Sequence, residues 1–221
     1  MRFSPVSTSK ESYQNEWKID QGFGAVTTYG RHEGVDLNLK TGGDTDLGQP
    51  LYAIAPGQIV YYHYGSHPTS GFGRHIVYRI EGPWGVRWVM YSHCDTDGFL
   101  NSVQNVTEGQ VIARLGKSGN SPTAHLHLSI WKVDPSTNGG IDSIAHNDSE
   151  LNAKWEDPLL FIEKWSQPVQ PPITDQTIIS AALLNWPQDL EVQQVRGILN
   201  DYKIKVSSLE NKISAAKVAL G

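Results

Sequence analysis

The sequence predicts a mainly β fold, an antiparallel β-sheet domain, with a C-terminal α-helical extension that is coiled-coil-like. Short runs rich in β-formers, with apolar and polar residues alternating, follow one another along the chain as far as Trp165. Glycine, proline and aspartate separate these runs, and little helical pattern lies between them. Beyond a proline-rich stretch the apolar residues change to steps of three and four, which is the period of a helix.

The strand predictions depend on this alternation and on the turn residues that bound each run. The runs lie at residues 51–54, 58–64, 74–80, 86–93, 110–115 and 125–133. A polar loop rich in Gly, Asn and Ser follows at 134–154, and we expect it to form one wall of a groove. The domain organisation predicted from these features is an N-terminal segment 1–19, a main β domain 20–165, a linker 166–173 and a helical extension 174–221.

The linker contains Pro168, Pro171 and Pro172, so it should be extended and semi-rigid. In the extension the apolar positions repeat over about four heptads, which is the spacing of a coiled coil. These positions are Val192, Val195, Leu199, Tyr202, Val206, Leu209, Ile213, Ala216 and Leu220. The pattern favours a homo-oligomer formed through this helix. The alternative is a helix that folds back on its own chain.

The chemistry of the chain is indicated first by His125 and His127, which lie two residues apart in a predicted strand. Residues two apart in a strand point to the same face. Upstream, His32 and Asp36 add an imidazole and a carboxylate, so three zinc ligands could come from these two segments. The remaining histidine of the pair would then be an acid/base candidate. The alternative is an exposed strand face that carries two imidazoles. His93, at the end of another predicted strand, would lie at the mouth of the same site.

Several ordered motifs of the chain resemble those of the lysostaphin-type (LytM-like) zinc metallopeptidases, which cut peptide cross-links in bacterial cell walls. The resemblance covers roughly residues 20 to 165. Its elements are His32-Glu33-Gly34-Val35-Asp36, Pro50-Leu51-Tyr52-Ala53, Gly57-Gln58-Ile59-Val60, Gly71-Phe72-Gly73, Tyr91-Ser92-His93, Val106 to Ile112, Gly116-Lys117-Ser118-Gly119, His125-Leu126-His127 and Asp157-Pro158.

The resemblance implies a site residue by residue. His32, Asp36 and His127 would bind Zn²⁺, while His93 and His125 would flank the water and act as general base and general acid, in either order. Zinc lowers the pKa of a bound water towards ~7, so a nucleophile would exist near neutral pH. The implied activity is that of a metalloendopeptidase acting on the peptides of bacterial peptidoglycan.

The other reactive residues are predicted to be inert. His63 and His67 lie where a strand runs into a loop, and His75 and His146 match no position of the family. Cys94 follows His93 directly, which raises the possibility of a thiol protease. A lone cysteine is more often a small buried residue, and consecutive strand residues face opposite ways.

The composition of the chain restricts the classes of partner that it is expected to bind. The 221 residues carry a formal net charge of -5, which gives no electrostatic reason to expect nucleic-acid binding. No run approaches the ~18 apolar residues of a membrane span. The first ten residues lack the apolar stretch of a secretory signal, which suggests release by lysis, carriage on a phage particle or prior removal of a leader. Of these, a phage lysin or tail-associated enzyme is favoured.

Two alternatives from other functional classes remain. One is a catalytically idle module that binds peptidoglycan or serves in assembly with the same fold. The other is a virion assembly protein with a structural zinc ion, but a structural site would be closed by four protein ligands. Among substrates, the sequence favours diaminopimelate-type cross-links over glycine bridges, because no basic wall-binding module is evident.

Overall fold

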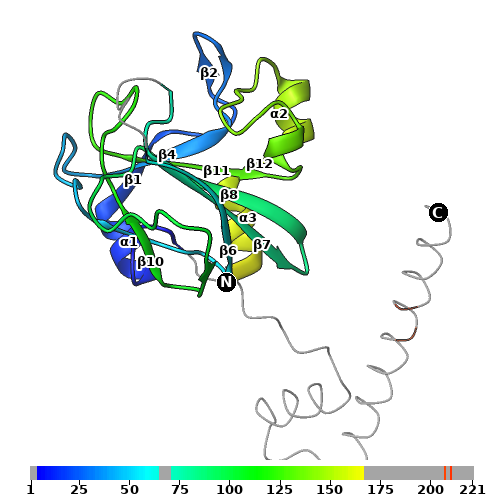
Figure 1. Cartoon of the computed structure of the whole chain (residues 1–221), viewed down its shortest axis with the longest axis horizontal. Helices are drawn as coiled ribbons and strands as arrows, with labels where there is room; N and C mark the ends of the chain where they lie inside the picture. The colour runs from blue at the N-terminus through cyan, green and yellow to red at the C-terminus, as the bar shows by residue number, and fades with distance from the viewer. Residues whose placement is uncertain (1–3, 65–70, 167–206, 208–209, 211–221) are drawn as a thin grey trace, which may run out of the picture. The chain divides into compact units, whose positions relative to one another are not determined.

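The computed structural model describes residues 4–64, 71–166, Ser207 and Glu210. Its centre is an antiparallel sheet of eight strands in the order β1-β4-β11-β8-β7-β6-β9, with β12 paired to β11 (Figure 1). The strands are β1 (Trp17–Gln21), β4 (Gly34–Leu39), β6 (Gly57–His63), β7 (His75–Gly82), β8 (Gly85–Ser92), β9 (Asn105–Val106), β11 (Leu126–Trp131) and β12 (Trp155–Glu156). The predicted antiparallel β domain is therefore confirmed.

Smaller elements surround this sheet. Two two-stranded sheets pair β5 (Pro50–Tyr52) with β10 (Val111–Arg114), and β2 (Val26–Thr27) with β3 (Gly30–Arg31). The helices of the described residues are α1 (Lys10–Glu16), the 3-10 turn η1 (Pro135–Thr137), α2 (Asp148–Lys154) and α3 (Pro158–Ser166). The β2–β3 hairpin and α2 lie at the same end of the sheet (Figure 1), where Arg31 forms an ion pair of 2.7 Å with Asp148.

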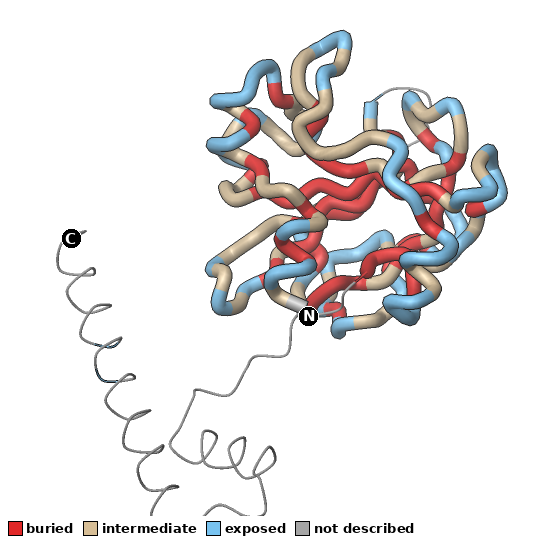
Figure 2. The backbone as a smooth tube through the Cα atoms, turned by 180° about the vertical axis from the view of Figure 1, so that it is seen from behind, coloured by how far each residue is buried: buried red, intermediate tan, exposed pale blue. Residues whose placement is uncertain are grey.

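The two faces of the sheet have different roles. In β11, Leu126, Leu128 and Ile130 point into the main hydrophobic core. The alternate residues His127 and Ser129 therefore point to the opposite face. Buried residues gather along the central strands, whereas the exposed residues lie mainly on loops (Figure 2). One face of the sheet thus packs on the main core, whereas the other carries polar groups and a second hydrophobic cluster that includes Trp131 and Trp155.

The six predicted strands all occur, with ends that differ by one or two residues. The structure also forms β4 at residues 34–39, a strand that the six predicted runs do not include. In β4, Val35 and Leu37 join the core and alternate with Gly34, Asp36 and Asn38. This alternation is present in the sequence and is the signal for the strand.

The C-terminal predictions lie outside the described residues, apart from Ser207 and Glu210. The coiled-coil-like helix, the linker and the domain limits remain predictions. Within the described part of the chain, no helix is long and apolar enough to cross a membrane.

Candidate metal centre

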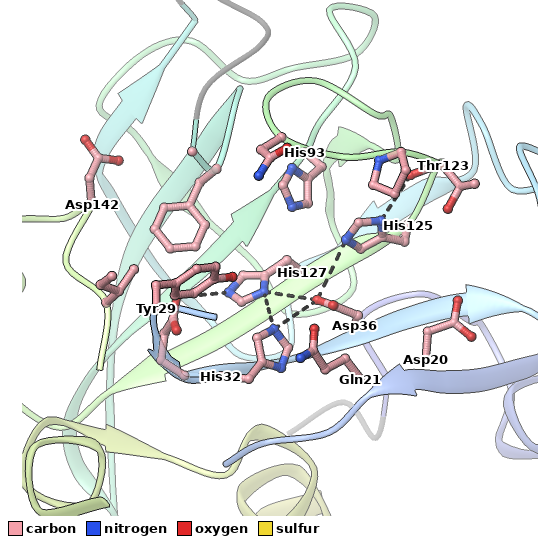
Figure 3. A pocket seen from close by; sticks show the side chains of 16 residues that line it. Asp20, Gln21, Tyr29, His32, Asp36, His93, Thr123, His125, His127 and Asp142 are labelled. Carbon is pink, nitrogen blue, oxygen red and sulfur yellow. Dashed lines mark hydrogen bonds and ion pairs between the residues drawn. The ribbon is translucent and has the colours of Figure 1, made fainter. Parts of the chain in front are cut away.

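The neighbouring strands β4 and β11 bring the three predicted zinc ligands together. Asp36 and His127 are directly opposite each other in this antiparallel pair. His32 lies two residues before β4 begins. The donor atoms of His32, Asp36 and His127 lie within 4.8 Å of one another, and the three side chains point toward a common centre (Figure 3). The two segments predicted from sequence therefore form one site.

The donor atoms form a nearly regular triangle. His32 Nε2 lies 3.0 Å from His127 Nδ1 and 3.3 Å from Asp36 Oδ1, and His127 Nδ1 lies 3.1 Å from Asp36 Oδ1. In a tetrahedral zinc site with ligand distances of about 2.0–2.1 Å, neighbouring donors are about 3.3 Å apart. Two imidazoles and one carboxylate are also the donor types that zinc binds in catalytic sites. The residues therefore fit a zinc ion in both chemistry and spacing.

The protonation of these groups favours a cation between them. His32 Nδ1 lies 3.1 Å from the carbonyl oxygen of Gly22. Because a carbonyl only accepts, a neutral His32 donates from Nδ1 and presents the lone pair of Nε2 to the site. Burial acts to raise the pKa of Asp36, but the contacts of its carboxylate with the imidazoles of His127 and His32 outweigh burial and hold this pKa far below its usual range. Asp36 is therefore an anion.

The glycine of the His-x-Gly-x-Asp segment has a steric role. A Cβ atom on Gly34 would lie 2.4 Å from the carbonyl oxygen of Leu128 and 2.8 Å from Cε1 of His127. The imidazole of His127 thus lies directly over Gly34, and any side chain there would displace it. The motif needs glycine at this position because a metal ligand of the next strand occupies the space.

His93 is held beside this triangle by an unusual backbone conformation. It directly follows β8 and has φ of 59°, the one non-glycine residue with positive φ in the described part of the chain. Its backbone N–H donates to the carbonyl of Phe72 (2.9 Å), and its Nδ1 lies 2.8 Å from the carbonyl of Ser118. Such strained conformations persist where the surroundings enforce them, often at functional sites.

Burial, and then the neighbouring imidazoles of His125 and His127, lower the pKa of His93 to about 3. His93 is therefore neutral. Because Nδ1 donates to the carbonyl of Ser118, the lone pair lies on Nε2.

The two glycine-rich motifs are the loops that position His93. Gly73 and Gly119 both have positive φ, and a Cβ on Gly119 would lie 2.4 Å from the backbone nitrogen of Gly73. Ser118 joins the loops because its hydroxyl accepts from the N–H of Arg74 and donates to the carbonyl of Cys94. The Gly71–Gly73 and Gly116–Gly119 motifs are far apart in sequence, but both thus serve to position His93.

His125 completes the cluster. Its Nδ1 lies 3.0 Å from the carbonyl oxygen of Thr123, so the neutral imidazole donates there and presents Nε2 to the site. Nε2 lies 3.7 Å from Oδ1 of Asp36, and the rings of His93 and His125 have centroids 4.6 Å apart. In Figure 3 these two imidazoles lie together, beside the three candidate ligands. All five predicted site residues therefore line one region.

The site lies in a cavity of about 720 Å³. Asp142 and Ile144 contribute to its lining, as expected for a wall formed by the 134–154 loop. Sequence reasoning missed two aromatic residues of this cavity, Tyr29 and Phe72. Phe72 lies between the two glycines of the Gly-x-Gly motif, and that position was the available signal.

Among the residues predicted to be inert, Cys94, His63, His75 and His146 are not part of the lining of this cavity. Cys94 is buried in the main core, and burial raises the pKa of its thiol, so it is no nucleophile. His75 is buried and stacks on His63, with ring centroids 5.4 Å apart. His67 lies outside the described residues.

Comparison with solved structures gives the following similarities. The catalytic domain of lysostaphin from Staphylococcus simulans is 24% identical, with a TM-score of 0.48, over 70% of this chain and 98% of that chain. The catalytic domain of the prophage-encoded M23 protein EnpA from Enterococcus faecalis is 24% identical, with a TM-score of 0.43, over 62% of this chain and 98% of that chain. A zinc-containing peptidase from Vibrio cholerae is 24% identical, with a TM-score of 0.44, over 58% and 36% respectively. No curated protein matches the chain.

A protein-family model gives the decisive comparison. The model described as peptidase family M23 matches residues 30–140, which is half of the chain and includes all five site residues. The same region contains β4, β8 and β11, the strands around which the donor triangle and the two further imidazoles are arranged. The chain therefore belongs to peptidase family M23, a family of zinc metallopeptidases that act on peptidoglycan, and His32, Asp36 and His127 form its candidate zinc site.

Proposed function

We propose that this protein is a zinc endopeptidase that hydrolyses peptide cross-links of bacterial peptidoglycan. His32, Asp36 and His127 would hold the metal, and His93 and His125 would carry out the acid-base chemistry. One observation carries the proposal: a donor triangle with sides of 3.0–3.3 Å lies beside two further imidazoles in one cavity. A structural zinc site would have no need of these extra imidazoles.

Zinc at this site would polarise the scissile carbonyl and lower the pKa of the attacking water. The chain's own residues manage the protons. His93 and His125 each donate Nδ1–H to a backbone carbonyl, which leaves the Nε2 lone pairs directed into the site. One Nε2 would take a proton from the attacking water, and a protonated Nε2 would then deliver a proton to the leaving amine. Anchoring at Nδ1 keeps both rings oriented throughout.

The substrate is tested with purified peptidoglycan of two types, one with diaminopimelate cross-links and one with glycine bridges. Zinc-loaded wild type is compared with zinc-loaded His125→Ala, and new amino termini are identified by mass spectrometry. We expect the wild type to cleave the diaminopimelate-type wall and His125→Ala to lose most of this activity. Acid-base residues contribute about 10²–10⁴-fold to the rate.

The zinc content of both proteins is measured in parallel, because His125 lies near Asp36. Loss of activity with full zinc occupancy would support an acid-base role. Absence of cleavage of either wall by zinc-loaded wild type would contradict the proposed endopeptidase and would support a binding module with the same fold.

A further inference from the structure

The four imidazoles of the cavity are not oriented in the same way. Three of them donate Nδ1–H to main-chain carbonyls and present Nε2 to the site; these are His32, His93 and His125. His127 is reversed, because its Nδ1 lies in the donor triangle. Its Nε2 is buried and has no hydrogen-bond partner among the described residues. The orientation of His127 therefore needs a different explanation.

The group that faces this nitrogen is the carboxylate of Glu33. Glu33 Oε1 lies 4.0 Å from His127 Nε2, and the Glu33 side chain is only 2% exposed. Its Oε2 is buried without a hydrogen-bond partner in the described part of the chain, where its one ion-pair contact is with His127. A carboxylate in such a position is costly unless a positive charge or a donor compensates it. Neither the core nor the fold requires an acid here.

We propose that Glu33 is a positioning residue for zinc, which favours the proton of His127 on Nε2 and so directs the Nδ1 lone pair into the donor triangle. The separation of 4.0 Å is longer than a hydrogen bond, so the interaction is that of a buried charge with a facing N–H dipole. A carboxylate behind a ligating histidine increases the basicity of the ligand and fixes its tautomer. The inference rests on the proposed zinc ligands but does not depend on the peptidoglycan substrate.

Two competing acceptors face His127 Nδ1: Asp36 Oδ1 at 3.1 Å and the lone pair of His32 Nε2 at 3.0 Å. Both favour a proton on that nitrogen, which would block the metal-binding lone pair. Glu33 acts on the opposite nitrogen and offsets this preference. This effect makes the chain bind zinc more tightly than the three ligands would alone.

The test compares zinc affinity in wild type, Glu33→Gln and a control, Asp142→Asn. Asp142 is another carboxylate that lines the same cavity. Zinc dissociation constants are measured by competition with a chromophoric chelator, and thermal melts are recorded with and without zinc. We expect Glu33→Gln to weaken zinc binding about 10–100-fold and Asp142→Asn to leave it unchanged within about twofold. We expect the metal-free Glu33→Gln protein to be at least as stable as the wild type, because a buried unpaired charge is removed.

Nitrogen-15 NMR of labelled histidines supplies a readout that a merely structural role would not change. In the metal-free protein, Glu33→Gln should shift the His127 proton from Nε2 towards Nδ1. Unchanged zinc affinity in Glu33→Gln would overturn the proposal, as would an equal loss of stability with and without zinc. If Glu33→Gln fails to fold, the metal-free wild type still tests the proposal. Nitrogen-15 NMR that places the His127 proton wholly on Nδ1 in this protein would also overturn the proposal.

His127→Ala separates this inference from the proposed function. If His127→Ala binds zinc as tightly as wild type, the ligand assignment itself fails. If His127→Ala loses zinc while Glu33→Gln retains wild-type affinity, only the role of Glu33 fails.

Discussion

Replacing Gly34 with alanine should disrupt the zinc site through a single methyl group. The added Cβ would lie 2.8 Å from Cε1 and 2.9 Å from Nε2 of His127, and 2.4 Å from the carbonyl oxygen of Leu128. Carbon atoms in contact prefer about 3.5–4.0 Å, so the imidazole must move by roughly 0.7 Å or more. The carbonyl of Leu128 belongs to a strand of the central sheet and cannot easily yield.

Catalytic and metal-binding groups must be held within about 0.5 Å of their productive positions, so this displacement is large enough to matter. We expect zinc affinity to fall by at least about 10-fold, the lower end of the losses seen when the support of a metal ligand is removed. Overpacking in the sheet should also lower the free energy of unfolding by about 1–3 kcal/mol. Chelator competition measures the first effect and urea unfolding of the metal-free protein measures the second.

Gly22→Ala is the matched control. Gly22 also supports the site, through its carbonyl oxygen, but a Cβ there would meet nothing within 4 Å. We expect this variant to bind zinc as the wild type does. Wild-type zinc affinity and stability in Gly34→Ala would refute the steric explanation of the motif glycine.

Three further predictions follow from the same contacts. Zinc removal by a chelator should lower the melting temperature and zinc addition should restore it, because a ligand that binds only the folded state stabilises it; equal melting temperatures would count against the site. Ser118→Ala should lower the free energy of unfolding by about 1–3 kcal/mol, because the N–H of Arg74 loses its buried acceptor, and it should reduce kcat through the displaced His93; urea unfolding and steady-state kinetics measure these effects. Cys94 should resist alkylation in the folded protein and react once urea unfolds it, because burial raises the pKa of its thiol; rapid labelling of the native state, followed by mass spectrometry, would contradict its placement in the core.

Much of the site could be predicted because its residue types are rare in a core and its spacing reflects strand geometry. The two-residue period of β11 places His127 on the face opposite Leu126 and Leu128, as the alternation of the sequence indicates. The motif histidines and Asp36 could be identified from the order of the motifs along the chain alone. The aromatic residues that line the cavity, Tyr29 and Phe72, lie in turns, where no strand period indicates the direction of a side chain, and only the Gly-x-Gly motif around Phe72 offered a signal.

By itself, the sequence predicted which side chains would form the candidate site and which face of β11 would carry His127. These are local properties, set by residue type and by the period of a strand. The tertiary structure alone decided that Asp36 and His127, which are 91 positions apart, have their donor atoms 3.1 Å apart. It also decided that His127 presents Nδ1 while Glu33 faces its Nε2, since a tautomer is set by neighbours from other strands. The pairing of distant strands, together with the burial that it produces, brings these polar residues together into a candidate metal site.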